Sequence, residues 1–368
     1  MGLYILLFFI PALVVMAITK LYFKWAYSWK EFATQAGGTL LILVAVFALG
    51  GYGQTYDTQL INGVVTELDA KQETCPSGWR SSRDNFCTEY RTRQVYSHTS
   101  CSGSGTSRSC TRHYDTEYNY TYGWERRYFV KSDIPENYEI ARTDRQGAVV
   151  PPRFAGIAIG DAVTGSYSYT NYIRASADSL FSEDAPTEAL PIAYPRVRDY
   201  YVANRVIFTG YEASSALFQE WNKSFTTVNG NISETGANAI VVVTGGRPEF
   251  ALALARAWEA HNINDVVTVI GMDGDAVSWV DVRSWSSNSI VAIAIENDIL
   301  ALETLDTQAI DAIIESAILN NFELKSMDEF EYLAEEIVPP MWAMIVAAIM
   351  LLIITPFVTY MFHRHDVM

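Results

Sequence analysis

Three apolar segments bracket one long polar stretch of this chain. They run roughly over Leu3–Thr19, Thr39–Tyr52 and Pro340–Met361. A helix needs about 20 mostly apolar residues to cross a hydrocarbon core about 30 Å thick. The third segment is long enough, the first is nearly so, and Ala36–Gly38 can extend the second. The pattern predicts three transmembrane helices, with one large domain on a single side of a bilayer.

Basic residues predict the orientation, because short cytoplasmic loops are rich in Lys and Arg. Lys20, Lys24 and Lys30 lie between the first two segments, and Arg364 follows the third. No basic residue precedes the first segment, which argues against a cleaved signal peptide there. A buried core helix is the alternative for the second segment. We expect the C-terminus in the cytoplasm and the large domain outside, which is the periplasm of a Gram-negative host.

The first half of the large domain, Gln54–Phe208, has the pattern of a β structure. Alternating apolar and polar positions predict strands at Gln59–Leu68, Arg127–Val130 and Tyr138–Ala141, and glycines and prolines separate them. The sequence therefore predicts a β-rich subdomain.

The pattern changes near Gly210 to one of helices and buried strands. Spacing predicts helices at Tyr211–Phe225, Pro248–His261, Thr307–Phe322 and Ser326–Glu336. Continuous apolar runs, typical of strands buried on both faces, predict strands at Ala237–Val243, Asp265–Gly271, Ala276–Val282 and Ile290–Ile295. This order indicates a three-layer α/β subdomain.

The predicted organisation is an α+β protein anchored in a membrane. A transmembrane helical hairpin covers residues 1–53, and the β-rich external subdomain covers residues 54–208, including a Cys- and Tyr-rich insert at 75–124. The α/β subdomain covers residues 209–338, and a last transmembrane helix with a short tail covers residues 339–368.

All four cysteines lie in the insert: Cys75, Cys87, Cys101 and Cys110. An even number of cysteines in an oxidising compartment predicts two disulfides, with three possible pairings. A zinc site shared with His98 and His113 is the alternative, although the spacing is long and irregular for zinc.

The same insert ends in a run of tyrosines that alternate with polar residues. They are Tyr114, Tyr118, Tyr120 and Tyr122. We interpret the run as one strand of an extended hairpin, clamped by disulfides and too poor in aliphatic residues to form a core. Exposed tyrosines are common at interfaces, so these residues form a predicted binding surface. Ordinary cross-strand tyrosine pairs are the alternative.

Two loops at predicted carboxyl ends of strands are candidate sites, because ligands of open α/β sheets bind there. Gly245, Gly246 and Arg247 precede a predicted helix, whose N-terminus suits an anion. The loop lacks the Gly-Lys-Ser/Thr ending of a nucleotide-binding P-loop, so ATP is not expected. The alternative is that the glycines only allow the chain to turn.

The second loop is acidic. Asp273 and Asp275, with Asp265 before them, offer the oxygen ligands that Ca²⁺ or Mg²⁺ prefer. A solvated turn is the alternative. The net charge of −16 does not favour nucleic acid as a partner.

Three segments carry a resemblance to uncharacterised membrane proteins of tailed bacteriophages. They are YTNYIRASADSLF, YPRVRDYY and NDVVTVIGMDGDAVSWVDVRSW. This family has no settled biochemical role, and its closely spaced cysteine pairs are absent here. The order of elements in Tyr211–Phe322 is similar to the TPM domain of membrane-tethered proteins. Some members of that family are linked to acid phosphatase activity and divalent-metal binding, which implies metal or phosphate work at the three aspartates.

We therefore expect a phage-encoded protein of the host inner membrane. Its periplasmic domain is predicted to be a binding or assembly module rather than an enzyme, with the lipid bilayer and a host or phage envelope protein as partners. A metal-dependent, phosphatase-like hydrolase is one alternative, and a structural homo-oligomer is another.

Overall fold

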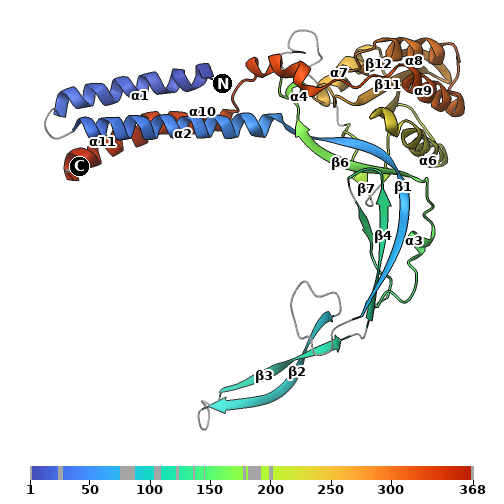
Figure 1. The fold of residues 1–368 in the computed structure, drawn as a ribbon, viewed down its shortest axis with the longest axis horizontal. Helices are drawn as coiled ribbons and strands as arrows, with labels where there is room; N and C mark the ends of the chain where they lie inside the picture. The colour runs from blue at the N-terminus through green and yellow to red at the C-terminus, as the bar shows by residue number, and fades with distance from the viewer. Residues whose placement is uncertain are drawn as a thin grey trace. The chain divides into compact units, whose positions relative to one another are not determined.

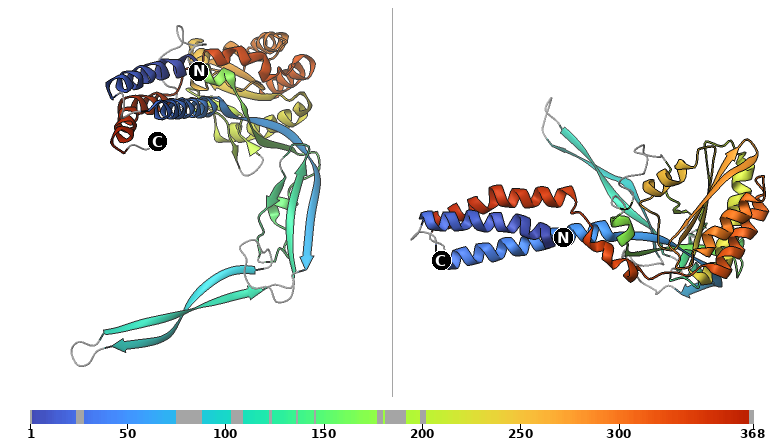
Figure 2. Two further views of the ribbon diagram at one scale, coloured as in Figure 1. Left: turned by 60° about the vertical axis from the view of Figure 1, so that its left-hand side comes forward. Right: turned by 90° about the horizontal axis from the view of Figure 1, so that it is seen from above.

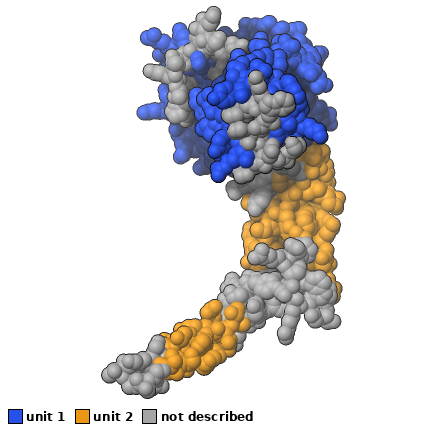
Figure 3. All heavy atoms as spheres, turned by 90° about the vertical axis from the view of Figure 1, so that its left-hand side faces the viewer, with its two compact units in different colours: residues 1–62, 164–368 blue, residues 63–163 orange. Residues whose placement is uncertain are grey.

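The computed structural model describes residues 2–23, 28–74, 88–102, 109–121, 124–135, 137–144, 146–176, 180, 192–198 and 202–365. The chain divides into two compact units (Figure 3). One unit comprises residues 1–62 and 164–368, and the other comprises residues 63–163. The predicted boundary between residues 208 and 209 falls inside the first unit and stays a prediction.

The described part of the chain contains three helices that are long and apolar enough to cross a membrane. They are α1 (Gly2–Phe23), α2 (Trp29–Thr55) and a third helix that begins with α10 (Met341–Ile349). The three lie side by side (Figures 1 and 2), and a cluster around Leu43, Phe47, Ala343 and Ala347 joins them. Helix α2 begins ten residues before the predicted apolar segment, because Ser28 and Glu31 form a capping box.

The third helix widens in its middle into a π-helical turn, Met350–Ile354, before continuing as α11 (Thr355–His365). Pro356 explains the widening, since a proline inside a helix removes one N–H and clashes with an earlier carbonyl. The Thr355 hydroxyl donates to the Met350 carbonyl at 2.8 Å, and Gln35 Nε2 donates to the Thr355 carbonyl at 2.8 Å. These side chains supply hydrogen bonds to the backbone beside the widened turn.

A four-stranded sheet forms the centre of the α/β part of the first unit. Its order is β12-β11-β10-β9, from strands β12 (Ala276–Ser284), β11 (Asp265–Asp273), β10 (Asn238–Thr244) and β9 (Val206–Thr209). Strands β9, β10 and β11 are parallel, and β12 pairs with β11 in the antiparallel direction. Every residue of β10 is buried, as its β-branched run predicts.

Helices cover both faces of this sheet. Val241 and Val243 point to the face of the sheet that is covered by three helices, α6 (Ser215–Asn231), α8 (Ile290–Leu300) and α9 (Thr307–Asn321). Ile240 and Val242 face the other way, toward α7 (Glu249–Ala257). The alternation of side chains along a strand thus divides one apolar run between two cores.

One predicted strand is wrong: residues 290–295 belong to helix α8. Val291, Ile295 and Ile299 are fully buried at intervals of four residues, which is helical spacing. A short apolar run does not distinguish a buried strand from a buried helix. The element at the predicted helix 326–336 is a 3₁₀ helix, η3 (Met327–Glu335). It packs through Phe330 and Leu333 against Ile173 of the short helix α4 (Tyr172–Ala175).

The second unit is built on the sheet order β5-β4-β1-β6. Its strands are β1 (Tyr56–Thr74), β4 (Trp124–Ser132), β5 (Tyr138–Ile140) and β6 (Ala162–Thr170), so β1 and β6 continue into the first unit. Tyr128 and Val130 of β4 are fully buried, and the Tyr128 hydroxyl donates to the Gly147 carbonyl at 2.8 Å. The prediction of strands here is confirmed.

The remaining elements are short, apart from one long hairpin. It consists of β2 (Thr88–Ser102) and β3 (Ser109–Thr121), which form a two-stranded sheet. The short elements are α3 (Pro152–Ala155), β7 (Val197–Arg198), β8 (Val202–Ala203) and η2 (Ser233–Thr235).

Candidate functional site

The described side chains of the β2–β3 hairpin are exposed on both faces. Of its side chains that the structure describes, at positions 94–102 and 110–116, only Val95 is even half-buried. A two-stranded hairpin without a core is at best marginally stable in water. Burial therefore does not account for its length, and a local crosslink and cross-strand pairs must hold it together.

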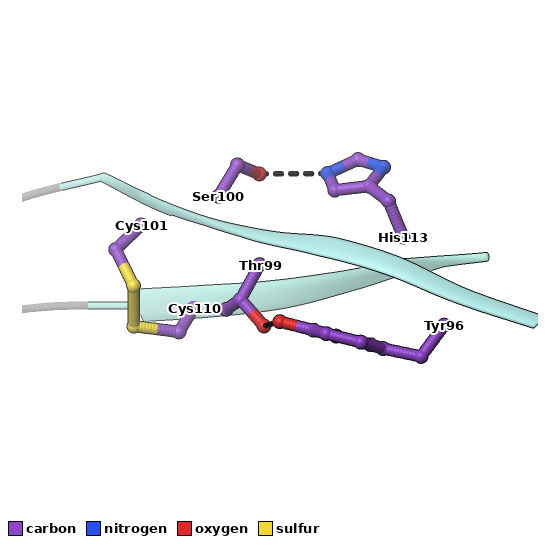
Figure 4. The surroundings of a disulfide bond; sticks show 6 residues. All are labelled: Tyr96, Thr99, Ser100, Cys101, Cys110 and His113. Atoms are coloured by element: carbon purple, nitrogen blue, oxygen red, sulfur yellow. Dashed lines mark hydrogen bonds between the residues drawn. A yellow bond between two sulfur atoms is a disulfide. The ribbon is translucent and has the colours of Figure 1, made fainter.

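Cys101 and Cys110 occupy directly paired positions on the two strands and form a disulfide (Figure 4). This confirms a cysteine pair in the insert and leaves neither sulfur as a thiolate ligand for zinc. Cys75 and Cys87 lie outside the described residues, so a second disulfide stays a prediction.

A β-bulge at Ser97 shifts the register of the hairpin, whose two faces differ chemically. Tyr96 pairs with Tyr114 and His98 pairs with His113, which makes Ser97 the extra residue. A bulge re-aims the side chains on either side of it. Figure 4 shows Tyr96 and Thr99 on the side of the disulfide, and Ser100 with His113 on the opposite side.

The disulfide face is aromatic. The rings of Tyr96 and Tyr114 meet edge to face, with centroids 6.2 Å apart, and both side chains are about half exposed. The Tyr96 hydroxyl lies 2.8 Å from Thr99 Oγ1. The sequence identified Tyr114 but missed Tyr96, because the bulge that brings Tyr96 onto this face has no sequence signature. Tyr118 and Tyr120 belong to β3, but their side chains and the whole of Tyr122 lie outside the described residues.

The acidic loop is a tight hairpin turn between β11 and β12. Asp273 pairs with Ala276, so Gly274 and Asp275 form a two-residue turn, and Gly274 has a positive φ of 61°. Asp265 lies at the opposite end of β11 from Asp273. At about 3.3 Å per residue of strand, the two residues are roughly 26 Å apart. Asp265 therefore cannot share an ion with Asp273 and Asp275. In the described part of the chain, no three His, Cys, Asp or Glu side chains are grouped to hold a metal ion.

The predicted anion loop follows β10 as expected. However, the backbone N–H and carbonyl of Gly246 are already hydrogen-bonded to neighbouring side chains. The Gly246 N–H donates to Thr244 Oγ1 at 3.0 Å, and the Gly246 carbonyl accepts from Trp279 Nε1 at 3.1 Å. A Cβ on Gly245 would lie 2.3 Å from the Gly210 carbonyl oxygen. This close approach gives the first glycine a packing role, while Arg247 is exposed.

Sequence reasoning missed a buried polar network at the amino ends of β10 and β11. Asp265 is fully buried and accepts hydrogen bonds from the Tyr194 hydroxyl, Asn238 Nδ2 and the Asn262 N–H. Burial raises the pKa of the Asp265 carboxyl to about 6, although these hydrogen bonds lower it. The Arg205 guanidinium, also buried, donates to Asn238 Oδ1 at 2.7 Å.

A cavity of about 700 Å³ borders this network, with Asp57, Arg174, Tyr194, His261 and Asn262 in its lining. Glu259, Ala260 and His261 all have positive φ values, of 49°, 68° and 54°. Three successive left-handed residues that are not glycine store strain, which is often a feature of functional sites. The pKa of His261 is lowered to about 4, chiefly by burial.

No family model, curated protein or solved structure matches this chain.

Proposed function

We propose that this protein is a membrane-anchored binding and assembly module that engages a protein of the bacterial envelope through the β2–β3 hairpin. The observation that carries the proposal is a disulfide-closed hairpin whose described side chains are exposed on both faces. Because these side chains add nothing to a core, they are available for contact with a partner. Tyr96 and Tyr114 supply the rigid, amphipathic contact area that interfaces favour.

The backbone of the hairpin offers a second means of binding. The described residues pair β2 only with β3, so each strand has one edge whose N–H and C=O groups are open to another strand. Addition of a strand to an open edge is a common mode of peptide recognition. A partner that contributes an extended segment would pair with this edge and cover the tyrosines.

The proposed location follows from the three apolar helices and from the charges beside them. With Lys20 and Lys30 near the ends of α1 and α2 on one side, the soluble part lies on the other side. We place the protein in the inner membrane of a phage host, with its large domain in the periplasm, in line with the family resemblance. The TPM-like fold and the hydrolase alternative stay predictions. Asp265 lies too far from Asp273 and Asp275 for the three to form one metal site for a hydrolase.

Site-specific photo-crosslinking in host cells tests the proposal. A benzophenone amino acid replaces Tyr114 on the hairpin in the full-length protein, and Tyr332, which is 66% exposed on η3, is the matched control position. We expect one discrete adduct with an envelope protein from position 114 and none from position 332. An adduct with a second copy of this chain would instead support the homo-oligomer. No adduct, or the same adduct from both positions, would contradict the proposal.

A further inference from the structure

The face of the hairpin opposite the disulfide carries two histidines in direct register. His98 and His113 are cross-strand partners, their imidazole rings are stacked with centroids 4.6 Å apart, and the planes are within 13° of each other. Both side chains are exposed. The pair shares an unbroken register with Cys101 and Cys110, so the two rings lie on the same face, and the bulge at Ser97 changes the register only beyond His98.

We infer that His98 and His113 form a two-histidine binding site for a late first-row divalent cation of the Cu²⁺, Ni²⁺ or Zn²⁺ class. Neutral imidazole is the ligand that these ions share, whereas Ca²⁺ and Mg²⁺ prefer oxygen. Metal–nitrogen bonds of about 2.0–2.1 Å require the two ligand nitrogens to be roughly 3 Å apart. In the stacked arrangement the ring planes are nearly parallel, with centroids 4.6 Å apart, so the in-plane lone pairs do not converge. Both exposed rings therefore rotate about their side-chain bonds to direct one nitrogen each at a shared ion.

The neighbours of the pair favour such a site. Ser100 Oγ lies 2.7 Å from His113 Nε2, and Ser97 Oγ lies 3.2 Å from His98 Nδ1. Hydrogen bonds to one ring nitrogen orient the ring and leave the other nitrogen for an ion. The disulfide at Cys101 and Cys110 holds the two strands in register three residues away, so the two histidines stay paired on one face.

Two protein ligands leave positions in the coordination sphere open. Water fills them in the isolated protein, and a side chain of a partner can replace the water. The site is independent of the proposed function, since the aromatic face and the strand edges can bind a partner without any ion.

Titration of the full-length protein with Ni²⁺ or Cu²⁺ tests the inference. The protein is purified without a histidine tag in detergent micelles, and binding is followed by calorimetry and by nitrogen splitting in the Cu²⁺ electron paramagnetic resonance spectrum. We expect one ion per chain with two nitrogen ligands. His98→Phe retains an aromatic ring opposite His113 but removes one metal ligand. Loss of a hydrogen-bond partner of a ligand alone typically lowers metal affinity by about tenfold or more, so loss of the ligand itself should lower it by at least as much. Tyr114→Phe, on the opposite face, should leave the affinity unchanged.

Two outcomes would overturn the inference. One is an affinity that is the same in the His98→Phe and His113→Phe proteins as in the parent, which would place the ion elsewhere. The other is no binding at millimolar ion. Crosslinking from position 114 in the presence of a chelator separates this result from the proposed function, because a metal-independent adduct would leave that proposal intact.

Discussion

Arg205 and Asp265, both fully buried, are joined through a single side-chain amide. Asn238 accepts from Arg205 Nε with its oxygen at 2.7 Å and donates to Asp265 with its nitrogen at 2.8 Å. The Asn238 amide thus bridges the Arg205 cation and the Asp265 carboxylate at the amino ends of β10 and β11, and we call this chain of hydrogen bonds the relay. Asn62 Oδ1 and Thr164 Oγ1 accept further hydrogen bonds from the guanidinium.

Replacement of Asn238 by alanine should disconnect this relay. Two buried charged groups would each lose a hydrogen bond, and breaking a buried charged network typically costs about 3 kcal/mol or more. Hydrogen exchange of the β10 and β11 amides in the full-length protein measures the loss. Asn320→Ala is the control, because Asn320 is exposed and, among the described residues, bonds within α9, at 2.7 Å to the Ser316 carbonyl. A change below about 0.5 kcal/mol in both variants would show that the relay is not stabilising.

The Asp265 carboxyl should make the protein less stable as the pH rises from about 4 to 6. Burial raises its pKa in the folded state from 3.8 to about 6. Between these values the folded state holds a proton that the unfolded state has lost, so the free energy of unfolding falls with rising pH, by about 3 kcal/mol in total. Asp265→Asn should remove this decline. The check is urea unfolding of both proteins across this pH range, and parallel curves would refute the assignment.

The His261 imidazole should act in the opposite direction. Its pKa in the folded state is lowered to about 4 from 6.5, chiefly by burial and further by the Arg283 charge. Its contribution to stability is complete above pH 6.5 and is lost as the pH falls through 4, again by about 3 kcal/mol. His261→Gln should therefore resist acid better than the parent protein in the same unfolding measurement. His113→Gln, at an exposed position, should show no such gain.

The sequence predicted the strands and helices well where a periodic pattern extended over a whole element. It failed for residues 290–295, where a run of apolar residues fits a strand and a helix equally. It also grouped Asp265 with Asp273 because they are close in sequence, although an extended strand separates them by its full length. The hydrogen-bond network of Asn62, Arg205, Asn238 and Asp265 joins four distant segments, and no local pattern encodes it.

The hairpin shows a similar limit. Alternating tyrosines predicted β3, but the face on which Tyr96 lies depends on one extra residue, Ser97. The pairing of Tyr96 with Tyr114 depends on the bulge, whereas the pairing of His98 with His113 follows the register of the disulfide. Register is set by pairing across the two strands, which the sequence of one strand does not determine.

The disulfide should stabilise the hairpin locally and nothing beyond it. A crosslink between Cys101 and Cys110 closes a loop of about ten residues, for which chain entropy gives about 2.7 kcal/mol. In the Cys101→Ser, Cys110→Ser double variant, exchange of the β2 and β3 amides should accelerate by about a hundredfold. The β10 and β11 amides should exchange at the parent rate. Equal rates in the hairpin before and after the change would mean that cross-strand pairs alone hold it.

Gly245, the first glycine of the predicted anion loop, should be essential for packing rather than for an anion. A Cβ at Gly245 would lie 2.3 Å from the Gly210 carbonyl oxygen. This oxygen belongs to the backbone, so it cannot move aside as a flexible side chain could. Gly245→Ala should therefore cost about 2 kcal/mol through a forced backbone shift between β9 and β10. Arg247→Ala, two residues along the same loop and exposed, should change stability by less than about 0.5 kcal/mol. Hydrogen exchange at β9 and β10 with and without inorganic phosphate measures both effects. Protection by phosphate that disappears in Arg247→Ala would instead establish an anion site at this loop.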